Sequence, residues 1–231
     1  MARASREVVR ALPLFSNVKA ELLDLLIRDA SLLNCACFTK LFDEGNQASV
    51  LHAVIEGEVE LFSGQGEDEA TLQIIHPRQT FCLPAVIQNQ KYRQSARTLT
   101  PARILALPAN VIRDLYDRDG SFARGIATAL AASYSHTMEA LKDLKLRRGD
   151  ERLANWILQT HCAQGGNGQI TLKYPKRTLA SELGMTPENL SRSLASFAKH
   201  GIFIKGRVLV ISDVEALRKL VRCGELRPED S

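Results

Sequence analysis

The chain lacks the features that mark membrane and secreted proteins. No stretch approaches the roughly 20 consecutive apolar residues that a helix needs to span a bilayer. Residues 1–14 contain no signal-peptide core, because Arg3, Arg6, Glu7 and Arg10 interrupt every apolar run. We therefore expect a cytoplasmic protein with no membrane partner.

Cysteine is scarce and unevenly spaced. An odd number of cysteines scattered along a chain that we expect in a reducing compartment argues against a disulfide framework. Cys35-Ala36-Cys37 lacks the paired C-x2-C spacing of zinc sites, so we predict no metal site. The five cysteines are Cys35, Cys37, Cys82, Cys162 and Cys223.

Signatures of catalysis are also missing. We find no paired acid/base carboxylates, no Cys-His nucleophile arrangement and no glycine loop that could cradle phosphate, so we predict that the chain is not an enzyme. The apolar share of 45% is ordinary for a globular protein. A length of 231 residues suits two modest domains that share an element between them.

The first half of the chain is rich in strand signals. A helical pattern over residues 7–30, interrupted near its start by Pro13, precedes a change to the period of strands. Turn signals separate the short β-like runs, and such spacing is typical of a barrel, sandwich or roll. The β-like runs are 50–55, 59–62, 71–75 and 102–107.

A long helical region follows. From residue 111 to residue 148 there is no proline, and a narrow apolar stripe recurs at spacings of four and three, as in a coiled-coil seam. The alternative is a helix packed on its own domain, but we favour a parallel two-helix dimer seam. The predicted dimerisation residues are Leu130, Tyr134, Thr137, Leu141 and Leu144.

A hinge over residues 147–150 ends this region. Asp150 is suited to cap the next helix, over about 151–163. A glycine-rich break at 164–168 and a short strand at 169–172 then lead to the motif that carries the function.

Residues 178–197, TLASELGMTPENLSRSLASF, have the pattern of a helix-turn-helix. Ala180 stands where the two helices would touch, and Gly184 stands at the turn, where a positive φ costs glycine little. Thr186 is a good N-cap and Pro187 a good first residue for the second helix. An ordinary αα-hairpin is the alternative, but these features together favour the DNA-binding motif.

Residues 202–211 predict a hairpin that turns at Gly206 and forms a wing, with Lys205 and Arg207 at its tip to meet phosphate. Ser212 and Glu215 resemble a capping box that opens a final helix ending near Val221.

The positive charge of the chain gathers in this region. The formal net charge is only +4, but between residues 173 and 210 only Glu182 and Glu188 oppose the basic residues, so we expect a positive surface. The basic residues there are Lys173, Lys176, Arg177, Arg192, Lys199, Lys205 and Arg207.

Glu188, Ser191 and Arg192 lie within one turn of the second helix and project from neighbouring points of its exposed face. Arginine can pair bidentately with guanine and glutamate can accept from cytosine N4, and such a pair contributes roughly 1–3 kcal/mol of discrimination. A salt bridge between Glu188 and Arg192 is the alternative, and the two residues could form it and contact bases as well. We predict DNA contacts from Lys176, Arg177, Thr186, Glu188, Asn189, Ser191, Arg192, Lys205 and Arg207.

Over nearly its whole length the chain resembles the CRP/FNR superfamily of transcription regulators. The resemblance rests on Glu44-Gly45, on Glu56-Gly57-Glu58-Val59, on the long helix and on the run from Glu188 to Arg192. It implies an α+β protein: a double-stranded β-roll sensor domain at 1–118, a dimerisation helix and hinge at 119–148, and a winged helix-turn-helix at 149–231. It also implies a homodimeric activator that binds double-stranded DNA and RNA polymerase.

The E-x-x-S-R pattern is similar to that of the FNR-type branch, whose members read a TTGAT half-site in an inverted repeat. Pro187 stands where cAMP-responsive members carry a base-reading arginine. The roll also departs from the cyclic-nucleotide pattern, because Leu83-Pro84 replaces Gly-Glu and Gln94 replaces the arginine that pairs with the phosphate. Arg93 could substitute only through a register shift. We therefore expect no cAMP, and a cyclic-nucleotide signalling module remains the alternative.

The N-terminus lacks the cysteine triad of the Fe–S branch, so no 4Fe–4S cluster is expected. The chain then most resembles the NNR/DNR branch, which governs denitrification, answers nitric oxide and is usually discussed as haem-based. His76, Cys82 and His136 are candidates for the effector pocket, and His52 is a further possible haem ligand. For each of these residues we favour a structural role, in packing or in a single hydrogen bond.

Overall fold

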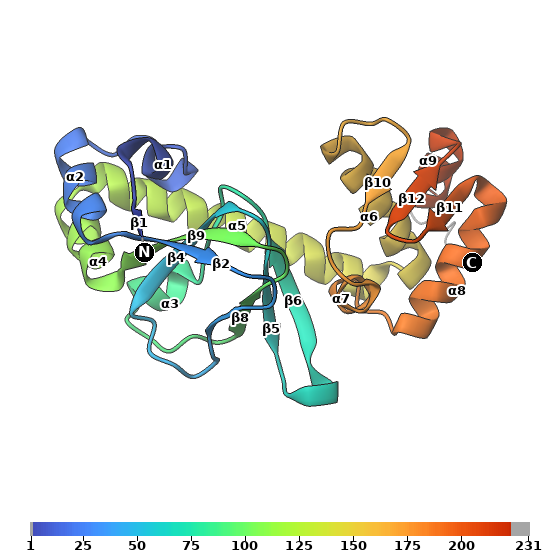
Figure 1. The fold of residues 1–231 in the computed structure, drawn as a ribbon, viewed down its shortest axis with the longest axis horizontal. Coiled ribbons are helices and arrows are strands. Elements are labelled where there is room, and N and C mark those ends of the chain that lie inside the picture. The colour runs from blue at the N-terminus through green and yellow to red at the C-terminus, as the bar shows by residue number, and fades with distance from the viewer. Residues whose placement is uncertain (1, 223–231) are drawn as a thin grey trace, which may run out of the picture. The chain divides into compact units, whose positions relative to one another are not determined.

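The computed structural model describes residues 2–222, so Cys223 and the last residues of the predicted DNA-binding domain lie outside the described part (Figure 1). The chain forms two compact units that divide between His136 and Thr137. None of the helices in residues 2–222 is long and apolar enough to cross a membrane.

The N-terminal unit is a roll of two antiparallel sheets (Figure 1). The first sheet has the order β1 (Ala2–Arg3), β2 (Ser31–Cys35), β9 (Ala102–Pro108), β4 (Val50–Glu56) and β7 (Thr80–Phe81). The second has the order β3 (Lys40–Phe42), β8 (Ser95–Thr98), β5 (Val59–Ser63) and β6 (Ala70–Ile75), with the short turn η2 (Gly66–Asp68) between β5 and β6. The four strands predicted in this unit are confirmed as β4, β5, β6 and β9, whereas its strands β1, β2, β3, β7 and β8 were not predicted.

Short helices cover the roll. They are α1 (Arg6–Arg10), η1 (Pro13–Phe15), α2 (Ala20–Asp29), α3 (Leu83–Ile87) and α4 (Ala109–Arg118). The helical pattern over residues 7–30 is therefore not one helix, because Pro13 starts the turn η1 that separates α1 from α2. Helices α2 and α4 contact each other and strand β9. The stacked rings of Phe15 and Phe122, with centroids 5.8 Å apart, tie η1 to the start of the next helix.

That helix is α5 (Gly120–Leu146). The predicted region from residue 111 is thus divided, because the extended backbone of Asp119 separates α4 from α5. The Asp119 carboxylate accepts a hydrogen bond from the Ser121 hydroxyl and one of 2.8 Å from the backbone N–H of Phe122. These two hydrogen bonds lower the pKa of Asp119 and satisfy an N–H group in the first turn of α5.

The C-terminal unit is a winged helix-turn-helix (Figure 1). Its elements are α6 (Gly149–Ala163), β10 (Gln169–Thr171), α7 (Lys176–Glu182), α8 (Pro187–Phe197), η3 (Ala198–His200), β11 (Ile202–Lys205), β12 (Val208–Ile211) and α9 (Val214–Arg222). The three strands form one antiparallel sheet in the order β10-β12-β11.

Two predicted helix caps are wrong by one or two positions. Helix α6 begins at Gly149, so Asp150 lies inside its first turn, and Glu151 instead accepts the Arg148 N–H at 2.8 Å. Helix α9 is capped by Asp213 rather than Ser212, because the Asp213 carboxylate accepts the Ala216 N–H at 2.9 Å. In both places the cap depends on the residue at which the backbone first becomes helical.

His52 on β4 lies in an aromatic cluster within the core of the roll. Its ring centroid is 5.3 Å from that of Phe42 and 5.5 Å from that of Phe81, and Tyr92 stacks on Phe42 at 3.8 Å. Among the described residues, Nδ1 of His52 has no hydrogen-bond partner. Burial lowers the pKa of His52 from 6.5 to about 4, so the folded roll holds a neutral imidazole.

Acid should therefore destabilise the roll through His52. The unfolded chain takes up a proton near pH 6.5 but the folded chain only near pH 4, so the stabilisation is fully present above this window and is lost as pH falls through it. From pH 7 to pH 5 we expect His52 to account for about 2 kcal/mol of the lost free energy of unfolding. Urea unfolding at both pH values should show a smaller loss in His52→Phe, and equal losses in the two proteins would contradict this account.

Candidate DNA-reading surface

The helix-turn-helix is held by an apolar layer beneath its two helices. Leu190, Leu194 and Phe197 form the buried face of α8, and Leu179 and Ala180 form that of α7. Helix α8 contacts α6, α7 and β11. Because three elements cover one face of α8, the residues on its other face are left to meet a partner.

The turn between α7 and α8 has the predicted geometry. Gly184 has a φ of +59°, a conformation that L side chains rarely adopt. The N–H of Met185 donates to the Ala180 carbonyl at 2.8 Å, which closes the turn. Thr186 caps α8, since its Oγ1 accepts the Asn189 N–H at 3.2 Å, and Pro187 is the first helical residue.

Glu188, Asn189, Ser191 and Arg192 are all exposed on α8. The Arg192 guanidinium donates to Asn189 Oδ1 at 2.6 Å, so the hydrogen bond that holds it goes to Asn189 rather than to Glu188. Hydrogen bonds from its own backbone N–H and from Thr186, with a smaller effect of the Arg192 charge, hold the pKa of Glu188 below its usual value. Glu188 is therefore a charged acceptor, and Arg192 keeps further N–H donors for a ligand.

The wing lies beside the segment that precedes α7. Gly206 and Arg207 form its two-residue turn, and Lys205 pairs with Val208 across the hairpin. The backbone carbonyl of Arg207 accepts a hydrogen bond of 2.8 Å from the N–H of Leu172. The guanidinium of Arg207 donates to the backbone carbonyl of Lys173 at 3.1 Å. The wing tip thus lies beside the segment that leads into the exposed Lys176 and Arg177 of α7. These hydrogen bonds between Arg207 and the segment before α7 were not predicted from the sequence.

The predicted seam on α5 is exposed for most of its length. Every residue from 131 to 142 is exposed, and Tyr134 has 67% of its surface accessible. Leu130 differs, because it packs against the core of the N-terminal unit, as the alternative interpretation expects. Met138 belongs to the same apolar face but was not among the predicted residues. An exposed apolar helix face of this kind is typical of an interaction surface.

The three candidate effector residues make different contacts. Cys82 is buried, and the Gln94 amide donates to its sulfur at 3.5 Å. His76 lies on the turn after β6 with Nδ1 3.4 Å from Glu58, and His136 is exposed on α5. Burial raises the pKa of Cys82 to about 12, so its thiol is neutral and a poor nucleophile. These contacts do not gather the three side chains into one haem site within a chain.

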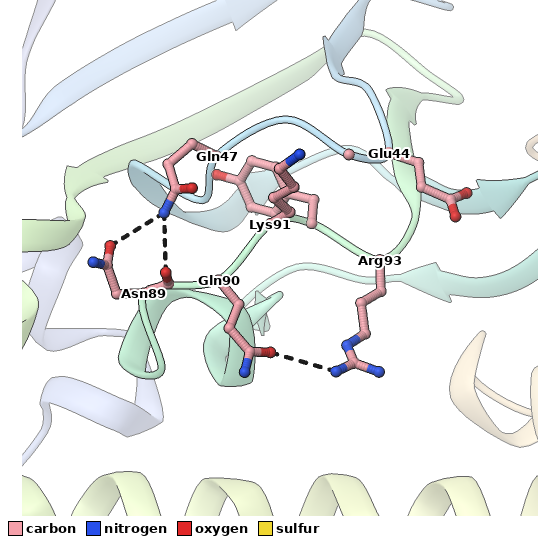
Figure 2. Close-up of a pocket in the computed structure, with 8 residues that line it drawn as sticks. Glu44, Gln47, Asn89, Gln90, Lys91 and Arg93 are labelled. Atoms are coloured by element: carbon pink, nitrogen blue, oxygen red, sulfur yellow. Dashed lines mark hydrogen bonds between the residues drawn. The ribbon is translucent and has the colours of Figure 1, made fainter.

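A surface depression lies between residues 44–47 and 89–93 (Figure 2). Gln47 donates to the backbone carbonyl and the side chain of Asn89, at 3.1 and 3.2 Å. Arg93 is exposed and reaches Gln90 at 3.4 Å, whereas the next residue, Gln94, is the one that contacts Cys82. The residue whose side chain contacts Cys82 is therefore the neutral Gln94. The guanidinium of Arg93 contacts Gln90 instead.

Comparison with known proteins gives two family matches. Residues 37–119 match the cyclic nucleotide-binding domain, and residues 151–220 match the Crp-like helix-turn-helix domain. These ranges contain most of the roll and nearly all of the described C-terminal unit after the hinge.

Relatives and solved structures match the chain over most of its length. The CRP-like cAMP-activated global transcriptional regulator of Mycobacterium tuberculosis is 25% identical over 188 residues, which cover 79% of this chain and 84% of the relative. The anaerobic regulatory protein of Aggregatibacter actinomycetemcomitans is 24% identical over 193 residues, covering 78% and 72%. The structure of a putative cAMP-binding regulatory protein from Silicibacter pomeroyi DSS-3 is 26% identical with a TM-score of 0.65, covering 94% and 97%.

These relatives are transcription regulators rather than enzymes. With a cyclic nucleotide-binding domain followed by a long helix and a Crp-like helix-turn-helix, the chain belongs to the Crp/Fnr family and is a DNA-binding transcription regulator.

Proposed function

We propose that the protein acts as a homodimer that reads a TTGAT-like inverted repeat through α8. The observation that carries this proposal is the exposed group of Glu188, Ser191 and Arg192 on the first turns of a helix capped at Thr186. Arg192 pairs with the O6 and N7 atoms of guanine, and the charged carboxylate of Glu188 accepts from the N4 amine of cytosine. Ser191, between them, contacts a neighbouring base.

Exposed basic residues on both sides of α8 bind the phosphates. Lys176 and Arg177 stand in the first turn of α7, and Lys205 and Arg207 stand on the wing. Such contacts fix the register of the protein on the duplex and carry no sequence information. Arg207 donates to the Lys173 carbonyl, which holds its guanidinium in place beside α7.

The apolar face of α5 joins the two protomers. Tyr134, Met138 and Leu141 are exposed large hydrophobic residues, and half of the surface of Leu144 is exposed. Thr137 stands within the same stripe. Parallel pairing of two such stripes buries them and gives the protein the two-fold symmetry of an inverted repeat.

The signal is nitric oxide, low oxygen or a related redox change rather than a cyclic nucleotide. A cyclic phosphate needs a charged partner where it is buried, but the position beside Cys82 holds the neutral Gln94. One relative is named an anaerobic regulatory protein, which supports a low-oxygen role. As an activator under these conditions, the protein would also contact RNA polymerase and control genes such as those of denitrification.

Loss of Arg192 should relax specificity. Arg192→Ala should cost about 1–3 kcal/mol on the cognate repeat and remove the preference for guanine at one position. Lys205→Ala should weaken all sequences alike and reduce the slope of binding against salt by about one unit. Arg218→Ala, on α9 and paired with Glu215, is the matched control for lost charge.

The measurement is binding to single-base variants of the repeat at two salt concentrations. Equal loss of affinity by Arg192→Ala on every sequence would make Arg192 a phosphate or structural residue. Absence of any preference for an inverted repeat by the wild-type protein would contradict the proposed function itself.

The dimer should depend on the exposed part of α5. Tyr134→Glu with Leu141→Glu places two charges in the seam, so the protein should sediment as a monomer at micromolar concentration and lose binding to the repeat. The matched control is Glu139→Gln with Lys142→Gln, which changes exposed polar residues of the same helix. A wild-type monomer at the same concentration would exclude this seam.

Cyclic nucleotides should not act on the protein, whereas redox signals should. Calorimetry with cAMP and cGMP should show no binding at micromolar concentration, because the phosphate lacks its cationic partner. Visible spectra and operator binding should be recorded with and without haem, nitric oxide and oxygen. Micromolar binding of a cyclic nucleotide that alters DNA affinity would favour the signalling-module alternative instead.

A further inference from the structure

Three backbone carbonyls converge on the side chain of Arg152 in α6. Its Nε donates to the Leu183 carbonyl at 2.8 Å, its Nη2 to the Gly184 carbonyl at 3.1 Å and its Nη1 to the Arg147 carbonyl at 2.6 Å. Leu183 and Gly184 lie between α7 and α8, whereas Arg147 directly follows α5. One side chain thus joins the turn that precedes the recognition helix to the end of the dimer helix.

The chemistry of these carbonyls explains why arginine stands here. The last carbonyls of a helix have no N–H partner within the helix, and a cation near them is stabilising. A guanidinium carries several N–H donors in a rigid planar fork, and here each of its three nitrogens serves a different carbonyl. A lysine ammonium at the same place is a single point that cannot reproduce this fork.

Two close contacts support the same connection. A Cβ built on Gly184 would lie 2.7 Å from Leu144 Cδ2, and one built on Gly149 would lie 3.0 Å from Met185 Cε. A side chain of α5 therefore lies over the glycine of the turn, and a side chain of the turn lies over the glycine of the hinge. We call Leu144, Gly149, Arg152, Gly184 and Met185 the hinge–turn joint.

Leu144 also belongs to the dimer stripe. Half of its surface is exposed, so one part of the side chain touches Gly184 while another part is free to meet the second protomer. The joint therefore lies between the residues that set the dimer and the residues that read bases.

We propose that Arg152 is a positioning residue that locks the helix-turn-helix turn onto the end of α5, so that a dimer reads half-sites at one spacing only. The inference rests on the proposed function. Half-sites on one face of DNA lie about 34 Å apart, and one base-pair step is about 3.4 Å. A recognition helix that moves by a few ångströms about the joint accepts neighbouring spacings.

The first experiment needs no DNA. Amide hydrogen exchange of segment 178–190 is measured in the wild-type protein, Arg152→Met and Arg152→Lys, with Arg148→Met as the matched control. Arg148 is an exposed arginine of the same hinge, and its side chain lies 3.9 Å from the carboxylate of Asp150. We expect about tenfold faster exchange in Arg152→Met, an intermediate rate in Arg152→Lys and no change in Arg148→Met.

The second experiment measures binding to inverted repeats whose spacer is lengthened or shortened by one or two base pairs, and to a single half-site. The wild-type protein should prefer one spacer by about tenfold or more. Arg152→Met should lose most of that preference while its affinity for the single half-site stays within about twofold of wild type, and Arg152→Lys should recover part of the preference. Fluorescence of Trp156, the only tryptophan, checks that each variant is folded.

An unchanged spacer preference in Arg152→Met would overturn the proposal. So would an equal loss of affinity on every repeat and on the single half-site, because Arg152 would then serve folding alone. If Arg152→Met does not fold, the proposal is decided by Arg152→Lys, which must weaken the spacer preference. A wild-type protein without preference for inverted repeats would contradict the proposed function. Even in that case, unchanged amide hydrogen exchange in Arg152→Met would show that Arg152 does not hold the turn.

Discussion

The C-terminal unit depends on a turn that closes because residue 184 has no side chain. Its φ of +59° is available to glycine at little cost, and Leu144 occupies the space in which a Cβ would lie. From this turn Thr186 caps α8, and the apolar residues of α8 then face α6 and α7. The exposure of Glu188 and Arg192 follows, since a helix buried along one face presents its other face to solvent.

The roll has a family fold, and the groups at Cys82 and His52 within it are neutral. Residues 37–119 match the cyclic nucleotide-binding domain and form most of the two-sheet roll. However, the amide of Gln94 faces the neutral thiol of Cys82, and His52 is held neutral among aromatic rings. A domain can keep its shape through apolar packing while the few residues that recognise a ligand are replaced.

Helix α5 contributes to both units and changes character along its length. Phe122 and Ile126 are buried in the roll and Leu130 packs against its core, whereas every residue from 131 to 142 is exposed. The same helix ends beside Gly184, where Arg152 gathers the carbonyls of Arg147, Leu183 and Gly184. Helix α5 therefore packs against other elements at both of its ends and is exposed between them.

The sequence by itself determined the elements that depend on near neighbours. Gly184, Thr186 and Pro187 specify the turn and the cap of α8 within four positions, and short β-like runs between turn signals predict β4, β5, β6 and β9. Tertiary structure alone decided the rest. Arg152 meets carbonyls 31 and 32 positions away, and the brace of Arg192 is Asn189 rather than Glu188. Such contacts depend on how helices pack and on which rotamer fits, and neither is encoded in the period of a short segment.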